Sequence, residues 1–156
     1  MAWSTILVPH DFSASAEHAV RIARAEARIH GARIVLLHVA ELMPHFGPDT
    51  TLMVRPGTTT PISVRRYVVE TAEADLYAVA REVLADGIQV TVVVRSGVPV
   101  DEIRAYVREH PVDAIVMGTH GRTGLRHALV GSVAERIVRT SPVPVLTIRH
   151  PDPPAS

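Results

Sequence analysis

The sequence predicts a single α/β domain built on a five-stranded parallel sheet with helices on both faces. Five short apolar runs alternate along the chain with amphipathic segments, which is the order expected of βα units. Several of these runs are apolar throughout, as in strands covered on both faces. The expected strands are Thr5–Pro9, Arg33–Val39, Gln89–Val94, Ala114–Met117 and Val143–Ile148. Because crossovers are right-handed, the simplest arrangement is a doubly wound, flavodoxin-like or Rossmann-like sheet of order 3-2-1-4-5.

Four helices are expected between these strands. The first spans Ala14–His30, where small apolar residues share one face and Gly31 follows as a C-terminal cap. The second runs from about 63 to 85 and carries an apolar stripe at helical spacing. The third begins near Pro99, whose following acidic residues suit the positive end of a helix dipole, and it stops at a proline. The fourth spans 132 to about 140 and has one apolar side.

The segment Ala40–Ile62 departs from this alternation, because it holds four prolines and two glycines. A connection this long in a compact domain is usually a lid, a binding loop or a mobile insert. The domain is expected to cover residues 1–150, with 151–156 as a disordered tail. In the last expected strand, Pro144 cannot donate a ladder hydrogen bond, so it belongs at the start of a strand or on an edge strand. Residues 145–148 would otherwise form an exposed apolar edge.

Composition excludes several classes of function. Sixteen basic residues balance sixteen acidic ones, so no global positive field draws in nucleic acid or an anionic membrane. The chain has no cysteine, which excludes disulfides, thiolate metal sites and cysteine nucleophiles. Neither a leader-type start nor a membrane-length apolar run is visible, so a cytoplasmic protein is expected. The nine histidines are scattered without zinc-ligand spacing.

A glycine-rich loop follows the fourth strand and ends at the fourth helix. Its glycines and the serine after them have the spacing Gly-x2-Gly-x9-Gly-Ser, formed by Gly118, Gly121, Gly131 and Ser132. Backbone N–H groups in such a loop can surround phosphate oxygens, and a helix that begins at the serine favours an anion. Two arginines of the loop can add positive charge: Arg122 and Arg126.

Other interpretations of these residues remain open. The spacing is neither a Walker A loop nor a dinucleotide fingerprint. The glycines can simply turn the chain, and Ser132 with Glu135 forms a capping-box pattern that needs no ligand. Asp11, at the end of the first strand, can accept hydrogen bonds from a base or ribose, or it can cap the first helix together with Ser13.

The expected sheet order brings the glycine-rich loop close to the end of the first strand, where Asp11 lies. In a 3-2-1-4-5 sheet the first and fourth strands are neighbours, where the winding reverses, and ligands bind outside the carboxyl ends of strands there. Pro9 to Asp11 and Gly118 occupy such ends, and Val39 of the second strand can form an apolar wall. A nucleotide site at this edge is therefore the leading hypothesis.

With these motifs the chain resembles the universal stress proteins, in their nucleotide-binding subgroup. The resemblance covers nearly the whole chain and is most specific in the glycine loop. It also rests on Ile-Leu-Val-Pro-x-Asp at 6–11, Leu-His-Val at 37–39, Gly97, Asp-Ala-Ile-Val-Met-Gly at 113–118 and the closing segment 142–148.

The resemblance implies an ATP site, with a magnesium ion held through the phosphates rather than by direct protein ligands. Family positions around adenine correspond to Pro9, Asp11 and Val39. Positions lining ribose and phosphates correspond to Met117, Gly118, Gly121, Gly131, Ser132 and Val133. His10 stands where a common family pattern has a small or aliphatic residue, so it enters the expected site, and His120 and Arg122 join it through the loop. The resemblance also implies a homodimer across Val143–Ile148.

Three functions are considered. The first is an ATP-binding stress-response or signalling protein, in which the nucleotide orders the glycine loop, and with it a surface that an unidentified protein partner recognises. The second is a slow ATP-hydrolysing or phosphoryl- or adenylyl-transferring enzyme on the same site, for which His120 is the only candidate base near the phosphates. The third is a dimeric interaction module that binds no nucleotide.

Overall fold

The computed structural model describes residues 2–42, 52–119 and 132–149. The elements, in chain order, are β1 (Thr5–Pro9), α1 (Ala14–His30), β2 (Arg33–Ala40), β3 (Leu52–Val54), β4 (Pro61–Ser63), α2 (Val64–Ala85), β5 (Val90–Ser96), α3 (Pro99–Glu109), β6 (Ala114–Gly118), α4 (Ser132–Thr140) and β7 (Val145–Ile148). The five expected strands and four expected helices are all present.

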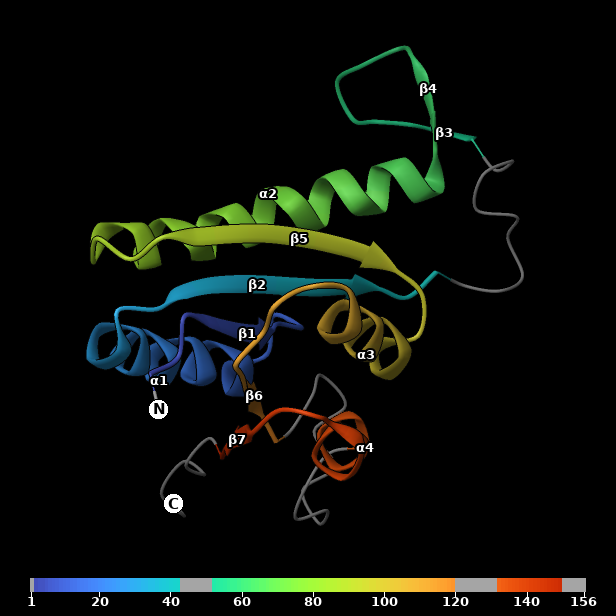
Figure 1. Cartoon of the computed structure of the whole chain (residues 1–156). Coiled ribbons are helices and arrows are strands. Elements are labelled where there is room, and N and C mark those ends of the chain that lie inside the picture. Colours follow the sequence, from blue (N-terminus) through green and yellow to red (C-terminus); the bar gives the residue numbers. More distant parts are fainter. Residues whose placement is uncertain (1, 43–51, 120–131, 150–156) are drawn as a thin grey trace, which may run out of the picture.

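The main sheet has the order β5-β2-β1-β6-β7 with every neighbouring pair parallel (Figure 1). In terms of the five expected strands this is 3-2-1-4-5, so the predicted doubly wound α/β fold is confirmed. The core lies in two layers. One cluster of buried residues joins α1 and α2 to one face of the sheet, and the other joins α3 and α4 to the opposite face.

Local signals explain where the helices begin and end. The Ser13 side chain accepts a hydrogen bond from the Ala16 N–H and caps α1, and Gly31 ends that helix in the left-handed conformation at φ 68°. Ser63 caps α2 in the same way, so this helix begins at Val64 rather than at the serine. At the last strand, Pro144 lacks an N–H, and β7 accordingly begins one residue later than this proline.

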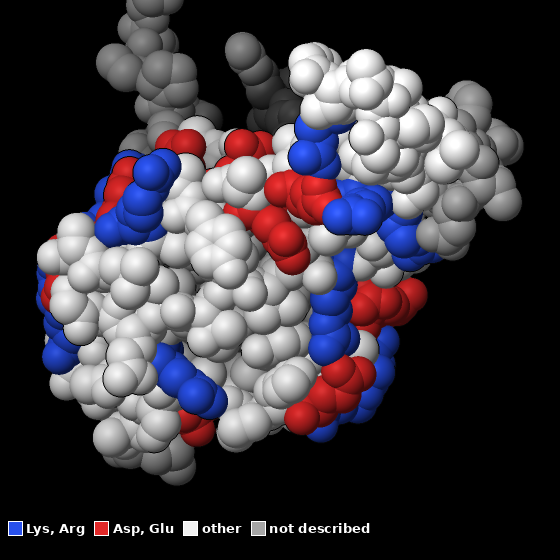
Figure 2. Space-filling view, turned by 90° about the horizontal axis from the view of Figure 1, so that it is seen from above, with Lys and Arg blue, Asp and Glu red and all other residues white. Residues whose placement is uncertain are grey.

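The structure adds one element that the sequence did not predict. Within Ala40–Ile62, the strands β3 and β4 pair antiparallel as a hairpin, which projects beyond the start of α2 (Figure 1). Residues 52–63 carry a single charged side chain, Arg55, and seen from above this end of the molecule is largely uncharged (Figure 2). The rest of the insert, 43–51, and the expected tail, 151–156, lie outside the described residues.

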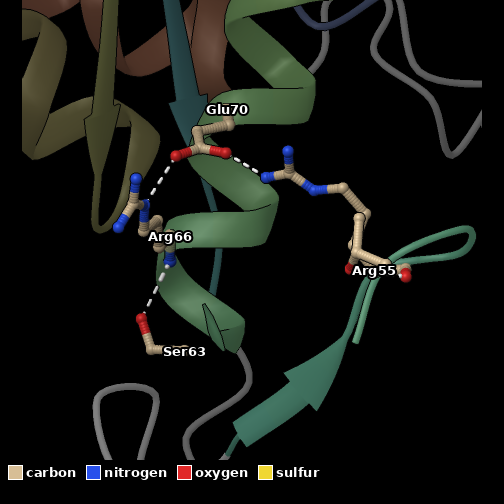
Figure 3. A network of polar contacts seen from close by, with 5 residues as sticks. Arg55, Ser63, Arg66 and Glu70 are labelled. Atoms are coloured by element: carbon tan, nitrogen blue, oxygen red, sulfur yellow. Dashed lines mark hydrogen bonds and ion pairs between the residues drawn. The ribbon is translucent and has the colours of Figure 1, made fainter. Parts of the chain in front are cut away.

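The hairpin is tied to α2 by one carboxylate. Glu70 lies between two guanidinium groups: it pairs with Arg55 of the hairpin turn, and its Oε1 accepts from Arg66 Nε at 2.6 Å (Figure 3). Both arginines lower the pKa of the Glu70 carboxyl, chiefly through these hydrogen bonds, that from Arg66 first. The network therefore fixes the hairpin relative to the helix that follows it.

In the part of the chain that the structure describes, none of the helices combines the length and apolar character needed to span a membrane.

Candidate functional site

The two central strands separate towards their carboxyl ends, and this separation, the crevice, lies at the expected nucleotide site. The pairing of β1 with β6 is confined to Ile6 with Ala114 and Leu7 with Ile115, although β1 continues to Pro9 and β6 to Gly118. Each strand continues its other pairing: the His10 N–H donates to Leu37 O at 2.8 Å. The carboxyl ends of β1 and β6 thus diverge at the position where doubly wound sheets bind ligands.

One side of this crevice is apolar. Val39, Met117 and Val133 all pack in or against the cluster on the α3 and α4 face, and Pro9 is half-buried two residues beyond Leu7 of the same cluster. Met117 is buried, whereas Val39 and Val133 remain half-buried and accessible. The structure therefore brings four of the predicted residues to one side of the sheet, where a flat apolar group such as a base can pack.

Gly118 is required for packing at the base of the crevice. A Cβ at this position would lie 2.4 Å from Ser15 Oγ and 2.8 Å from the Ser15 carbonyl carbon, closer than real Cβ atoms approach. Ser15 is itself buried at the start of α1 and donates to Ile148 O at 3.3 Å. The absent side chain at Gly118 thus lets α1 approach β6, whatever the backbone there binds.

One carboxylate oxygen of Asp11 stabilises a turn, and the other is available to a ligand. Its Oδ1 accepts from the Ser13 N–H at 3.0 Å and so stabilises the turn into α1, while Ser13 is the residue that caps the helix. Its Oδ2 has no hydrogen-bond partner among residues 2–42, 52–119 and 132–149. Asp11 is half-buried, so this oxygen can accept a hydrogen bond from a hydroxyl or amino group of a ligand.

The side chain of His10 lies on the other face of the sheet from the apolar wall. Its ring packs edge-on against Phe12, and Phe12 packs against both His38 and the cluster beneath α1 and α2. His10 Nδ1 accepts from the Phe12 N–H at 3.2 Å, so in the neutral ring Nε2 carries the proton. This buried N–H has no partner among the residues that the structure describes. Only the backbone of His10 borders the predicted site.

Burial keeps the His10 ring uncharged. Desolvation lowers its pKa to about 4, and the neighbouring His38 acts in the same direction, whereas the charge of Asp11 opposes the shift. The backbone of His10 is held by His38, whose Nδ1 lies 2.7 Å from His10 O. A histidine with so low a pKa is neutral near pH 7 and fits a packing role.

Two features of this junction had no sequence signal. Phe12 adopts a left-handed backbone at φ 64°, which costs a residue other than glycine about 1–3 kcal/mol. This conformation turns the chain from β1 into α1 and presses the Phe12 ring between two histidines. No sequence pattern distinguishes Phe12 from an ordinary core residue, and His38 stands out only as part of the Leu-His-Val segment of the family resemblance.

The start of α4 supplies the helix N-terminus expected at the site. Ser132 is its exposed first residue, and Ala134 and Ile137 anchor the helix in the same cluster as Met117. One oxygen of Glu135, the carboxylate of the expected capping box, accepts from Arg139 at 2.7 Å. The remaining predicted residues of the loop lie outside the described residues: His120, Gly121, Arg122 and Gly131, together with Arg126.

The described residues also bear on metal chemistry. Nowhere in residues 2–42, 52–119 and 132–149 do three or more histidine or acidic side chains come together as a metal site. The crevice offers one carboxylate oxygen as an acceptor, the N–H groups at a helix start as donors, and an apolar wall. Such a set suits an organic anion with a flat apolar part.

Comparison with known proteins identifies relatives over nearly the whole chain. The model of the universal stress protein family matches residues 2–149. Universal stress protein MJ0577 of Methanocaldococcus jannaschii is 29% identical over 155 residues, which cover 95% of this chain and 96% of that protein. Its solved structure superposes with a TM-score of 0.80 at 27% identity, covering 98% of this chain and all of that one. The universal stress protein of Archaeoglobus fulgidus, solved in complex with dAMP, has a TM-score of 0.63 at 25% identity, covering 95% of this chain and 99% of that one.

Proposed function

The chain belongs to the universal stress protein family, and from that premise we propose that it binds an adenine nucleotide, ATP with magnesium, in the crevice between the carboxyl ends of β1 and β6. The observation that carries the proposal is the divergence of these strands after Leu7 and Ile115, beside a half-buried apolar wall. The A. fulgidus relative bound to dAMP supports the choice of an adenine nucleotide.

Each part of the crevice suits one part of a nucleotide. The base packs on Pro9 and Val39, with Val133 on the same side of the sheet. Asp11 Oδ2 accepts a hydrogen bond from a ribose hydroxyl or a base amino group. The N–H groups at Ser132 and the positive end of the α4 dipole face the phosphates, whose charge the glycine loop and a magnesium ion share.

Calorimetry with Mg-ATP, dAMP and Mg-GTP tests this proposal. We expect saturable binding of the adenine nucleotides, and a loss of roughly tenfold in Mg-ATP affinity in Asp11→Asn, because a hydrogen bond to a charged acceptor is weakened. Asparagine keeps an oxygen for the turn to Ser13, so the fold is retained. Asp75→Asn, at an exposed position of α2, is the matched control and should bind as the wild type does. Absence of heat at millimolar Mg-ATP rejects the proposal.

The same proposal extends to a switch and a dimer. Nucleotide binding orders the glycine loop and the insert Ala40–Ile62, and so changes the surface available to a protein partner. Protease cleavage within the insert should slow in Mg-ATP, and an unchanged cleavage rate contradicts the switch.

A homodimer forms across β7, an edge strand on which Leu146 is 37% exposed and beside which Val138 of α4 is 52% exposed.

A further inference from the structure

A groove separate from the crevice runs along the sheet beside α3. It has a volume of about 460 Å³, and none of its lining residues belongs to the predicted nucleotide site. One end lies at the first residues of β1 and β2, Thr5 and Arg33, and the β5 side chains Thr91, Val93 and Arg95 follow along it. The other wall is formed by Tyr106 of α3 and by His110 and Pro111, which follow this helix.

The groove exists because α3 and α4 leave part of their face of the sheet open. The strand β5 is an edge strand, and its Val93 stays half-buried although it packs against the cluster under these helices. Val35 of β2 is buried and forms the floor next to it. Together the two valines give the groove an apolar base in contact with a polar rim.

One of the two guanidinium groups in the groove is already neutralised. Arg95 pairs with Glu109 at 2.5 Å and with Glu102 at 3.5 Å. It also lies over the Tyr106 ring, 5.1 Å from the centroid. This arginine is therefore part of the wall and carries little net charge into the groove.

The second guanidinium, that of Arg33, is not neutralised. Its Nε donates to Thr5 Oγ1 at 2.9 Å, which holds the side chain at the end of the groove. No carboxylate of residues 2–42, 52–119 or 132–149 lies within 4.0 Å of it, and its two terminal nitrogens have no hydrogen-bond acceptor there. Such a free planar pair of donors matches a carboxylate in bidentate geometry.

The Tyr106 hydroxyl adds a neutral donor beside this cation. Burial raises the pKa of Tyr106, and the charges of Arg95 and Arg33 only partly oppose the shift, so the phenol keeps its proton. The hydroxyl makes no hydrogen bond within the described part of the chain. The ring is fixed by its stacking on His110 at 4.2 Å, so the donor has a set position.

We infer that this groove is a second ligand site, which binds a small organic acid with one carboxylate on an apolar or aromatic body. The carboxylate lies on the free donors of Arg33 with the Tyr106 hydroxyl beside it, and the body covers Val35 and Val93. A single uncompensated cation matches a single negative charge, which disfavours a dianionic phosphate. The volume lies within the range of small-molecule sites.

A titration of the full chain, followed by NMR chemical shifts of the backbone N–H groups, tests the inference. The probe is 4-phenylbutyrate, and the matched compound is 4-phenylbutanamide, which carries no charge. Binding of the acid with a Kd on the order of 1 mM is expected for a ligand of this size. The amides of Thr91, Val93 and Tyr106 should shift saturably with the acid, with and without Mg-ATP. The uncharged amide should bind about tenfold more weakly, because it lacks the charge that Arg33 complements.

Variants of Arg33 distinguish binding of the acid in the groove from binding elsewhere on the protein. Arg33→Gln should weaken the acid about tenfold, and Arg33→Lys, which keeps the charge but not the planar pair of donors, should weaken it severalfold. If the first variant fails to fold, the second decides. Arg104→Gln, at an exposed position of α3 outside the groove, should leave the affinity unchanged. Any of three results overturns the inference: equal affinity for the acid and its uncharged amide, unchanged affinity for the acid in both Arg33 variants, or chemical shift changes confined to Gly118 and Ser132 in the crevice. These results leave the nucleotide proposal untouched.

Discussion

Replacing His10 by asparagine should flatten the dependence of stability on pH below neutrality. The His10 pKa is about 4 in the folded chain and near 6.5 in the unfolded chain, so the unfolded state takes up a proton first as the pH falls. Stability from the neutral ring is fully present above pH 6.5 and is lost between 6.5 and 4. Linkage gives a loss of about 2 kcal/mol at pH 5 and about 3 kcal/mol below pH 4.

Urea unfolding at pH 7, 6 and 5 measures this loss. Asparagine offers an oxygen where Nδ1 accepts the Phe12 N–H, so the variant keeps that contact although it leaves a cavity. The comparison is therefore between slopes with pH and not between absolute stabilities. Equal slopes for the wild type and His10→Asn, or an NMR titration midpoint of the His10 ring above 6, would refute the reasoning.

Three further predictions concern other parts of the molecule. Gly118→Ala should destabilise the fold by about 1–3 kcal/mol in urea unfolding, because its methyl group overlaps Ser15, and Ser15→Gly should restore part of the loss; full stability contradicts the packing argument. Glu70→Gln should speed thermolysin cleavage within residues 52–63, because the hairpin loses its ionic contact to α2, while Glu73→Gln should not; equal rates count against this anchor. Leu146→Arg should convert a dimer to a monomer in light scattering, and a wild type that is monomeric throughout removes the proposed β7 interface.

The sheet could be predicted from sequence because its signals are local and repeated. Runs such as the one at Ile6–Val8 are apolar on both faces, and right-handed crossovers then leave few orders for five such strands. The helix ends at Ser13 and Gly31 follow from side-chain capping and from the freedom of glycine at positive φ. The separation of β1 from β6 follows in turn, because the winding reverses between them.

The hairpin could not be predicted in this way. Its strands, Leu52–Val54 and Pro61–Ser63, are only three residues long. The contact that ties them to α2, between Arg55 and Glu70, joins residues fifteen apart in the sequence. Proline and glycine in the segment indicated an irregular loop, and tertiary anchoring overrode that signal. Local composition does not report such a contact.

The positions of the candidate site residues on the strands could be predicted, but the orientation of every side chain could not. Pro9 and Val39 lie on the apolar wall as expected, because alternation along a strand assigns them to one face. His10 was placed in the same site, yet its ring lies on the other face, packed against Phe12 in a left-handed conformation that no sequence pattern announces. The glycine at 118 was expected to expose its backbone to phosphate, and its contact with Ser15 supplies a packing reason for the same residue.

Amide chemical shifts during titration with Mg-ATP test the central claim most directly, because they report both binding and its place. The proposed site predicts saturable shifts at Val39, Met117, Gly118 and Ser132, with the amides of the α3 groove unmoved. A titration to several millimolar that leaves these four amides in place, or moves only residues remote from the ends of β1 and β6, contradicts the account.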